Sequence, residues 1–502
     1  MNPILLYELR QSVRNRSVLV AIVLYLAAMI VLTAVVMTNA IDLDHHLNIF
    51  LRYWVFGHGD SSAQKLITAL FRTYYVFATT VLIGFGAVKI AIERLNGDLL
   101  YTSPLTPGRI TWGKVQLGVV ISLLFGSMTL PFLAAAYLNR GIDVLGIFLT
   151  FLLVFALTQI HYSTTVAMFA GAISLSAVFA RLLPWFLGQS ILFILSIFLI
   201  ASGQELDFRE VLPGLMGATL VFCTISYLLA TAQFAPESAN RMFAVRVGLT
   251  VLFGVFLVVG VVYTIFDAPG IGNPSSALFP WLVILFFVLS YTLWLFVPYL
   301  FLVFICERTE LSHRQRQQIP QSLIGRLVAF PFYSGVANAM VWSVGLVLFG
   351  ILFLIVADDC SGRKISTERY NPFYGLFTFS LLFFNYCATS LLVCKLLLRR
   401  WMTRRWYWVP VCALVGTIIF AVIASVLAHA WFTPFRRHSL WEYLWNCPFL
   451  PYPWSTWEKD LAYQQYIYGE IWLALLCVVG LPWVIAAFRR FRRSDVDSFP
   501  LP

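Results

Sequence analysis

The amino-acid sequence predicts an all-α polytopic membrane protein with about twelve transmembrane helices. Two observations predict this class. Of the 502 residues, 60% are hydrophobic and only 11% are charged, whereas soluble domains carry about 25% charged residues. The apolar residues also form long stretches of about 20 residues, the length that crosses a hydrocarbon core of about 30 Å.

These apolar stretches divide the chain into predicted spans. Their limits are 17–39, 70–92, 113–138, 144–178, 182–202, 213–234, 246–266, 278–305, 333–357, 372–398, 408–430 and 468–488. The spans form two predicted six-helix halves, 17–234 and 246–493, with a cytoplasmic linker at 235–245 and a cytoplasmic tail at 494–502. The two longest outer segments are expected at 40–66 and 431–467.

The basic residues predict the orientation of these spans. Most of the 34 Lys and Arg residues fall on the side of the N-terminus when the spans alternate. Cytoplasmic loops are enriched in Lys and Arg, so both termini are expected in the cytoplasm. The same bias accounts for the net charge of +11 without a nucleic-acid partner.

Residues 1–16 are predicted to form a separate amphipathic helix at the membrane interface. Asn2 is suited to capping a helix, and Pro3 suits the first helical turn. The apolar face of this helix consists of Ile4, Leu5, Leu9 and Val13. The alternative is a plain cytoplasmic stub with a positive flank.

The segment from Gly108 to Lys114 has the spacing of a phosphate-binding loop, G-x-x-x-x-G-K. A true loop of this kind follows a buried strand and places Ser or Thr after the Lys. Here Val115 follows the Lys, and Pro104 and Pro107 interrupt any preceding strand. We therefore expect no nucleotide site in this chain.

The same region instead predicts a rigid apolar turn on the cytoplasmic side, between the second and third spans. Gly97 ends the outgoing helix, and the two prolines stiffen the turn that follows. Exposed apolar surface at such a turn indicates a docking site.

The order of these motifs resembles the permease subunits of type-2 ABC exporters over residues 1–245. The matching positions in the loop 93–114 are Glu93, Arg94, Gly97, Leu99, Leu100, Pro104, Leu105, Pro107, Gly113 and Lys114. Further matches are Asn2-Pro3, Glu8-Leu9-Arg10, Arg14 and the run from Pro236 to Arg241. Asp98 stands where Thr is usual in this family, and Leu95 and Leu100 stand where Glu is frequent.

The resemblance implies that the loop 93–114 and the N-terminal helix contact a separate ABC ATPase subunit. ATP and magnesium would bind to that partner, and this chain would be a transport subunit without a cofactor or enzymatic activity of its own. It also implies export across a bacterial cytoplasmic (inner) membrane. The chain would form both transmembrane halves alone, pair with itself or pair with a second permease.

The second half carries a comparable cytoplasmic segment at 306–326. Glu307-Arg308 corresponds to Glu93-Arg94, and Pro320 with Arg326 loosely matches Pro107 with Arg109. This indicates either a six-plus-six repeat with a second docking loop or a basic, solvated loop.

Polar residues near the middle of the fourth span form another candidate site. Gln159, His161 and Thr164 either line a translocation path or hydrogen-bond between helices, and the second interpretation is favoured because His161 is the only ionisable group there.

Two features of the outer segments remain open. No metal site is assigned, although Asp42, Asp44, His45 and His58 are suitable ligand types, because adjacent histidines rarely face one ion. Cys360 and Cys447 either pair or remain free thiols.

Two other functional classes were weighed. A polytopic glycosyltransferase would use an acidic pair such as Asp42 and Asp44 in the first outer loop, but it would leave the turn at 93–114 without a role. An ion-coupled carrier of twelve spans would need more ionisable groups at the centres of its spans.

Overall fold

The computed structural model describes residues 3–14, 16–37, 62–95, 105–138, 144–171, 208–236, 239–267, 311–361 and 459–492, with short helical pieces between 381 and 419. The chain divides into two compact units, residues 1–234 and 235–502. Every element in the described part of the chain is helical.

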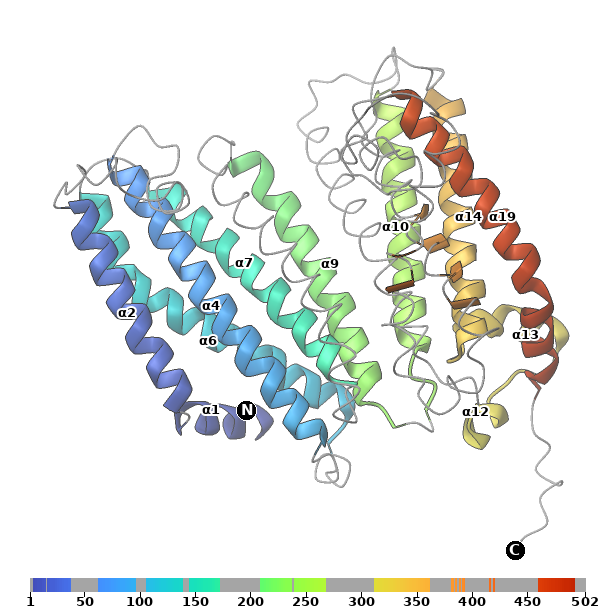
Figure 1. Ribbon diagram of the computed structural model, residues 1–502, viewed down its shortest axis with the longest axis horizontal. Coiled ribbons are helices and arrows are strands. Elements are labelled where there is room, and N and C mark those ends of the chain that lie inside the picture. The colour runs from blue at the N-terminus through green and yellow to red at the C-terminus, as the bar shows by residue number, and fades with distance from the viewer. Residues whose placement is uncertain are drawn as a thin grey trace, which may run out of the picture. The chain divides into compact units, whose positions relative to one another are not determined.

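Unit 1 is a helical bundle (Figure 1). Its elements are α1 (Pro3–Arg14), α2 (Arg16–Met37), α4 (Ser62–Leu95), α6 (Pro107–Leu138), α7 (Val144–Phe169) and α9 (Phe208–Phe234). Helix α7 packs against α4, α6 and α9, while α2 packs against α4 and, less extensively, α6. The short helix α1 lies crosswise at the foot of α2 and packs against α6 (Figure 1).

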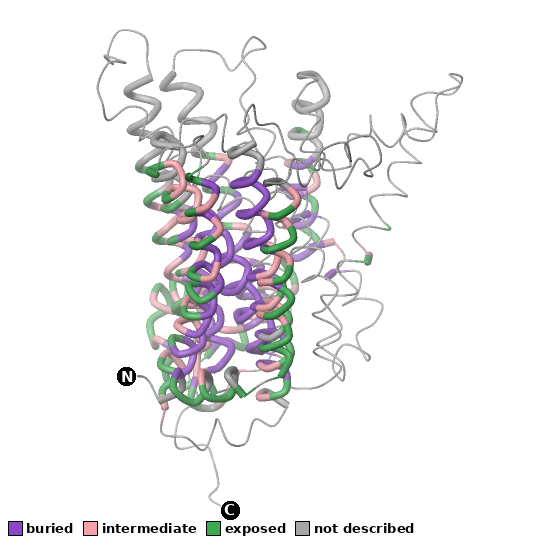
Figure 2. Tube along the Cα trace, turned by 90° about the vertical axis from the view of Figure 1, so that its left-hand side faces the viewer, coloured by how far each residue is buried: buried purple, intermediate pink, exposed green. Residues whose placement is uncertain are grey.

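The distribution of burial in unit 1 suits a lipid environment. Buried residues run down the inside of the bundle and exposed residues line its outside (Figure 2). On α2, the exposed side carries Leu19, Val20, Val23 and Leu24, whereas Tyr25 is fully buried. The outside of the bundle is therefore apolar and its inside holds polar atoms. Lipid hydrocarbon solvates apolar side chains but cannot hydrogen-bond with polar atoms.

Length and composition identify the helices that can cross a membrane. Among the described residues, five helices are long and apolar enough, or six if a bent helix pair counts as one span. The five are Arg16–Val35, Leu66–Glu93, Pro107–Leu138, Val144–Phe169 and Gly469–Arg490. The prediction of a multi-pass helical membrane protein is confirmed. The predicted total of about twelve spans also involves residues outside the described part of the chain.

Unit 2 contains α10 (Phe243–Asp267), α12 (His313–Gln317), α13 (Leu323–Ala329), the 3₁₀ turn η2 (Phe330–Phe332), α14 (Val336–Ser361) and α19 (Lys459–Arg490). Helix α14 packs against α10 and α19. The segment Leu323–Phe332 meets α14 at 89°. Gly335 lies at the bend with a φ of 140°, a conformation that favours glycine.

Several helices differ in extent from the predicted spans. Helices α4 and α19 begin at Ser62 and Lys459, so the ends of the expected outer segments 40–66 and 431–467 are helical. Hydropathy marks only the apolar part of such a helix, and its polar first turns escape detection. Helix α7 ends at Phe169, before the predicted limit of 178.

The start of α6 also lies earlier than predicted. The helix begins at Pro107, not at 113. Proline suits the first helical turn because its missing N–H has no helical partner there. The Thr106 carbonyl accepts from the N–H groups of Arg109 and Ile110, which closes this first turn.

The ring of Tyr162 packs directly against backbone in unit 1. A Cβ atom at Gly118 would lie 2.2 Å from its Cδ1, and one at Gly86 would lie 2.9 Å from its Cε2. Glycines at helix contacts let backbones approach closely in membrane bundles.

We predict that Gly118→Ala lowers the stability of unit 1 by about 1–3 kcal/mol, because the added methyl group overpacks this contact. A fall in the thermal unfolding midpoint of the detergent-purified chain would measure it. Gly84→Ala is the matched control, since a Cβ there meets nothing within 4 Å. Equal midpoints for the two variants would contradict the packing described here.

Candidate functional site

An ion pair ties together the two ends of the connection between α4 and α6. Lys114 Nζ donates to Glu93 Oε2 at 2.5 Å. The Lys114 side chain is 3% exposed and that of Glu93 is 23% exposed. A lysine ammonium at such depth requires an anionic partner, because its desolvation is otherwise uncompensated. Lys114 is therefore a structural cation.

The first turn of α6 is anchored to a third helix. Tyr227 on α9 donates its hydroxyl to the Gly108 carbonyl at 3.4 Å, and its ring meets Trp112 edge-on at 6.3 Å. Thr111 donates to the Pro107 carbonyl at 3.0 Å. These contacts hold the beginning of α6, where the α4–α6 connection ends.

Helix α1 lies at the same end of unit 1 as the end of α4 and the start of α6 (Figure 1). Leu5 is buried, whereas Leu6, Tyr7, Arg10 and Arg14 are exposed. Helix α1 also packs against α6, the helix that carries Lys114.

The other residues predicted for this loop fall at different places. Arg94 lies in the last turn of α4, and Leu105 is half-buried just before α6. Pro107 is the first residue of α6, and Gly113 is buried beside Lys114. Four positions lie outside the described residues, namely Gly97, Leu99, Leu100 and Pro104. The sequence drew attention to Glu93 and Lys114 separately, and their separation of 21 positions gave no sign of their contact.

The polar residues of the fourth predicted span lie on α7, facing neighbouring helices. His161 Nε2 and the Tyr75 hydroxyl of α4 are 2.5 Å apart. Gln159 donates to the Ser122 hydroxyl of α6 at 2.8 Å. These contacts link α7 to α4 and α6 through hydrogen bonds that are shielded from water.

The remaining polar groups of this region are also buried. Thr164 donates to carbonyls of its own helix, those of Ile160 and His161. Tyr74 donates to the Ser122 carbonyl at 3.1 Å. Sequence reasoning missed Tyr74 and Tyr75, because tyrosine is common in apolar helices and carries no positional signal.

In unit 2, Arg246 is fully buried at the bend between α13 and α14. It donates to the carbonyls of Pro331 at 2.7 Å and Tyr333 at 2.5 Å. Asn240 accepts from the Ser334 N–H and hydroxyl, both at 3.0 Å. The sequence indicated Arg246 only as a membrane-flanking charge, and its role as a bend-holding donor was missed.

Some of the other predicted site residues lie in the described part of the chain, and others lie outside it. Pro320 follows α12 and Arg326 lies in α13, whereas Glu307 and Arg308 lie outside the described residues. Cys360 lies in the last turns of α14. The remaining predicted positions outside the described residues are Asp42, Asp44, His45, His58 and Cys447.

Comparison with protein-family models, with curated proteins and with solved structures finds no match to this chain. The function of the chain is therefore inferred from its own geometry.

The ion pair predicts that its two charge-neutralising variants lose different amounts of folding stability. Glu93→Gln removes the anionic partner of a nearly inaccessible ammonium and should cost about 3–5 kcal/mol of stability. Lys114→Met leaves a carboxylate that retains some access to water, so its cost should be about 1–3 kcal/mol. Denaturant titration of the chain in mixed micelles would measure both values.

The double variant Glu93→Gln/Lys114→Met serves as the control. Because it removes both charges, its stability should exceed that of the Glu93→Gln variant. Additive losses in the double variant would show that the two side chains act independently.

Proposed function

We propose that this chain is the transmembrane permease subunit of an ABC transporter. A separate ATPase subunit would bind at the end of unit 1 that carries α1 and the α4–α6 connection. ATP hydrolysis there would reorient the helices and export a substrate. The chain would supply the path, and its partner would supply the energy.

The buried Glu93–Lys114 ion pair is the observation that carries this proposal. A loose loop would absorb a push from a partner by changing its own conformation. A connection whose two ends are tied together transmits the push to α4 and α6 as a pair. The ion pair therefore favours a mechanical role for this connection over that of a passive link.

The packing of unit 1 supplies a route from this end of the bundle to its interior. Helices α4 and α6 both pack against α7. The Tyr75–His161 and Ser122–Gln159 hydrogen bonds join the same three helices within the bundle. Movement of α4 and α6 as a pair would change these polar contacts, which links the proposed docking end to the bundle interior.

We expect the chain, purified from its native membranes, to bring with it an ATPase that has Walker A, signature and Walker B motifs. Replacing residues 99–104 with a Gly-Ser segment of equal length should abolish this association, since it removes the apolar turn and keeps both Glu93 and Lys114. Mass spectrometry of the purified complex would identify and quantify the ATPase.

The matched control is the same replacement at 268–273, which lies in a predicted outer loop. It should leave the association intact. Retention of the ATPase by the 99–104 variant would contradict the proposed docking site, and absence of any such ATPase from the wild-type complex would contradict the proposed function.

A further inference from the structure

Helix α13 presents an apolar face that the described part of unit 2 leaves uncovered. Leu323, Ile324, Leu327 and Val328 are 58%, 76%, 58% and 65% exposed. Their spacing places all four on one side of the helix. The other side carries Gly325, Arg326 and Ala329, which are partly buried. The exposed side of α13 is thus apolar along the whole helix.

The direction of α13 is fixed by buried hydrogen bonds. The guanidinium of Arg246 donates to carbonyls on the bend, and Asn338 Nδ2 donates to the Phe330 carbonyl at 2.6 Å. Tyr333 donates to the Gln318 carbonyl at 2.8 Å. Because Leu323–Phe332 meets α14 at 89°, α13 lies in the membrane plane when α14 spans the membrane.

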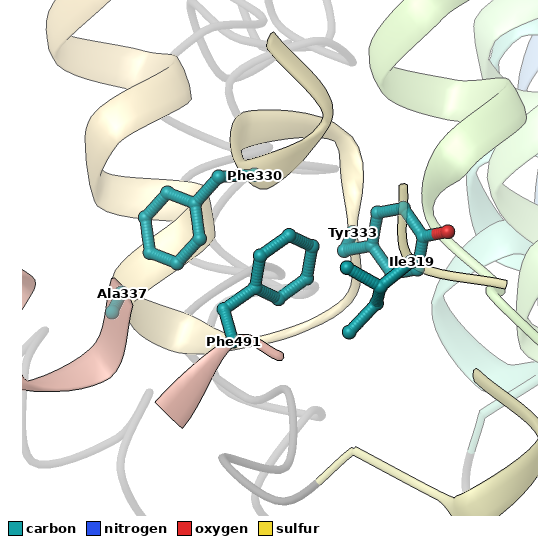
Figure 3. Close-up of a cluster of buried hydrophobic side chains, with 5 residues drawn as sticks. All are labelled: Ile319, Phe330, Tyr333, Ala337 and Phe491. Atoms are coloured by element: carbon teal, nitrogen blue, oxygen red, sulfur yellow. The ribbon is translucent and has the colours of Figure 1, made fainter. Parts of the chain in front are cut away.

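Phe491, just after α19, connects this region to the end of that span. Its ring lies 5.3 Å from that of Phe330 and 5.1 Å from that of Tyr333. Figure 3 shows Phe491 beside both rings, with Ile319 and Ala337 completing the cluster. The ends of α12, α13 and α19 are thereby held together at one end of unit 2.

Exposed arginines flank the anchoring side chains of this region. Gln315 is buried and donates to the Ala239 carbonyl at 2.5 Å, and exposed Arg314 and Arg316 lie on either side of it. Exposed Arg490 and Arg492 similarly flank buried Phe491.

The charged residues in the described segments of this region are basic, whereas Glu310 and Asp495 lie just outside those segments. The sequence contains no Asp or Glu in 311–336 or in 486–492. Within the described residues, the buried Nε of Arg326 on α13 has no hydrogen-bond acceptor. The region therefore offers cations with an apolar face beside them.

We propose that α13 and these arginines form a binding surface for an anionic phospholipid leaflet. The apolar face of α13 would lie among the acyl chains just below the headgroups, while Arg314, Arg316, Arg490 and Arg492 contact lipid phosphates. An in-plane helix with basic flanks has both the apolar area and the charge that anionic membrane surfaces attract.

Native mass spectrometry of the full chain, with phosphatidylglycerol and phosphatidylcholine supplied in equal amounts, tests the ionic part. The wild-type chain should retain phosphatidylglycerol preferentially. The variant R314Q/R316Q/R490Q/R492Q should lose about tenfold or more of that preference. The matched variant R314K/R316K/R490K/R492K should keep most of it. Equal preference in the wild-type and glutamine variants would overturn the proposal, provided that their unfolding midpoints in phosphatidylcholine agree.

A photo-crosslinking residue in place of Ile324 tests the occupant of the apolar face. In native membranes, the expected product is an adduct of the chain with phospholipid. A product containing an ATPase subunit would reassign the surface to ATPase docking, and one containing a second copy would reassign it to self-association. Either of these results would overturn the lipid assignment without affecting the proposal for the α4–α6 connection.

Discussion

The Glu93–Lys114 ion pair is the constraint on which the proposed coupling depends. It joins the last turns of α4 to the second turn of α6 at the end of unit 1 where α1 also packs. A charged lysine with almost no access to water is stable only while its partner stays in place. Loss of either side chain would therefore remove the tie between α4 and α6 and the charge compensation of the remaining group at the same time. Because the stability of this region depends on the Glu93–Lys114 contact, the α4–α6 connection is suited to transmitting force without deforming.

Buried polar groups give the two units their internal organisation. In unit 1, tyrosine, glutamine and histidine side chains link α4, α6 and α7, while the apolar side chains of α2 face outward. In unit 2, Arg246 and Asn240 satisfy carbonyl and N–H groups that the sharp bend removes from helical hydrogen bonding. Within a membrane such groups find no water, so their partners must come from neighbouring segments. The positions of these partners determine which helices pack together and where a helix turns.

The two proposed surfaces differ in chemistry as well as in position along the chain. The α4–α6 connection combines a predicted apolar turn with two ends joined by an ion pair, which suits a protein partner that pushes on it. The α13 surface combines an apolar face with four exposed arginines in described segments that contain no acidic residue, which suits a fluid anionic leaflet. A transporter of the proposed kind needs both functions, since force applied to one part of the membrane domain is useful only when another part is held. Helix α13 is well suited to such anchoring because Arg246 fixes its direction.

The sequence predicted the parts of the fold that depend on composition and local pattern. Apolar runs identified α2, α6, α7 and α19, and the expectation that Pro3 lies in a first helical turn is confirmed. Pro107 was expected in the turn before α6 and instead begins that helix. The start of α4 at Ser62 was misplaced because polar turns extend a helix beyond its apolar core. The end of α7 at Phe169 was misplaced in the opposite sense, because the apolar run continues to 178 although the helix ends earlier. The pairing of Glu93 with Lys114, and of Tyr75 with His161, depends on tertiary contact and leaves no trace in local spacing. The 89° bend before α14 was missed because it depends on Arg246, a residue about 85 positions earlier whose charge alone resembled a membrane flank.

A single-particle reconstruction of the complex purified from native membranes would test the central claim most directly. The account predicts density for an ATPase subunit against residues 96–106, at the end of unit 1 occupied by α1, with Glu93 and Lys114 still in contact above it. A partner bound at the opposite end of unit 1, or an ATPase that leaves the α4–α6 connection untouched, would contradict the account.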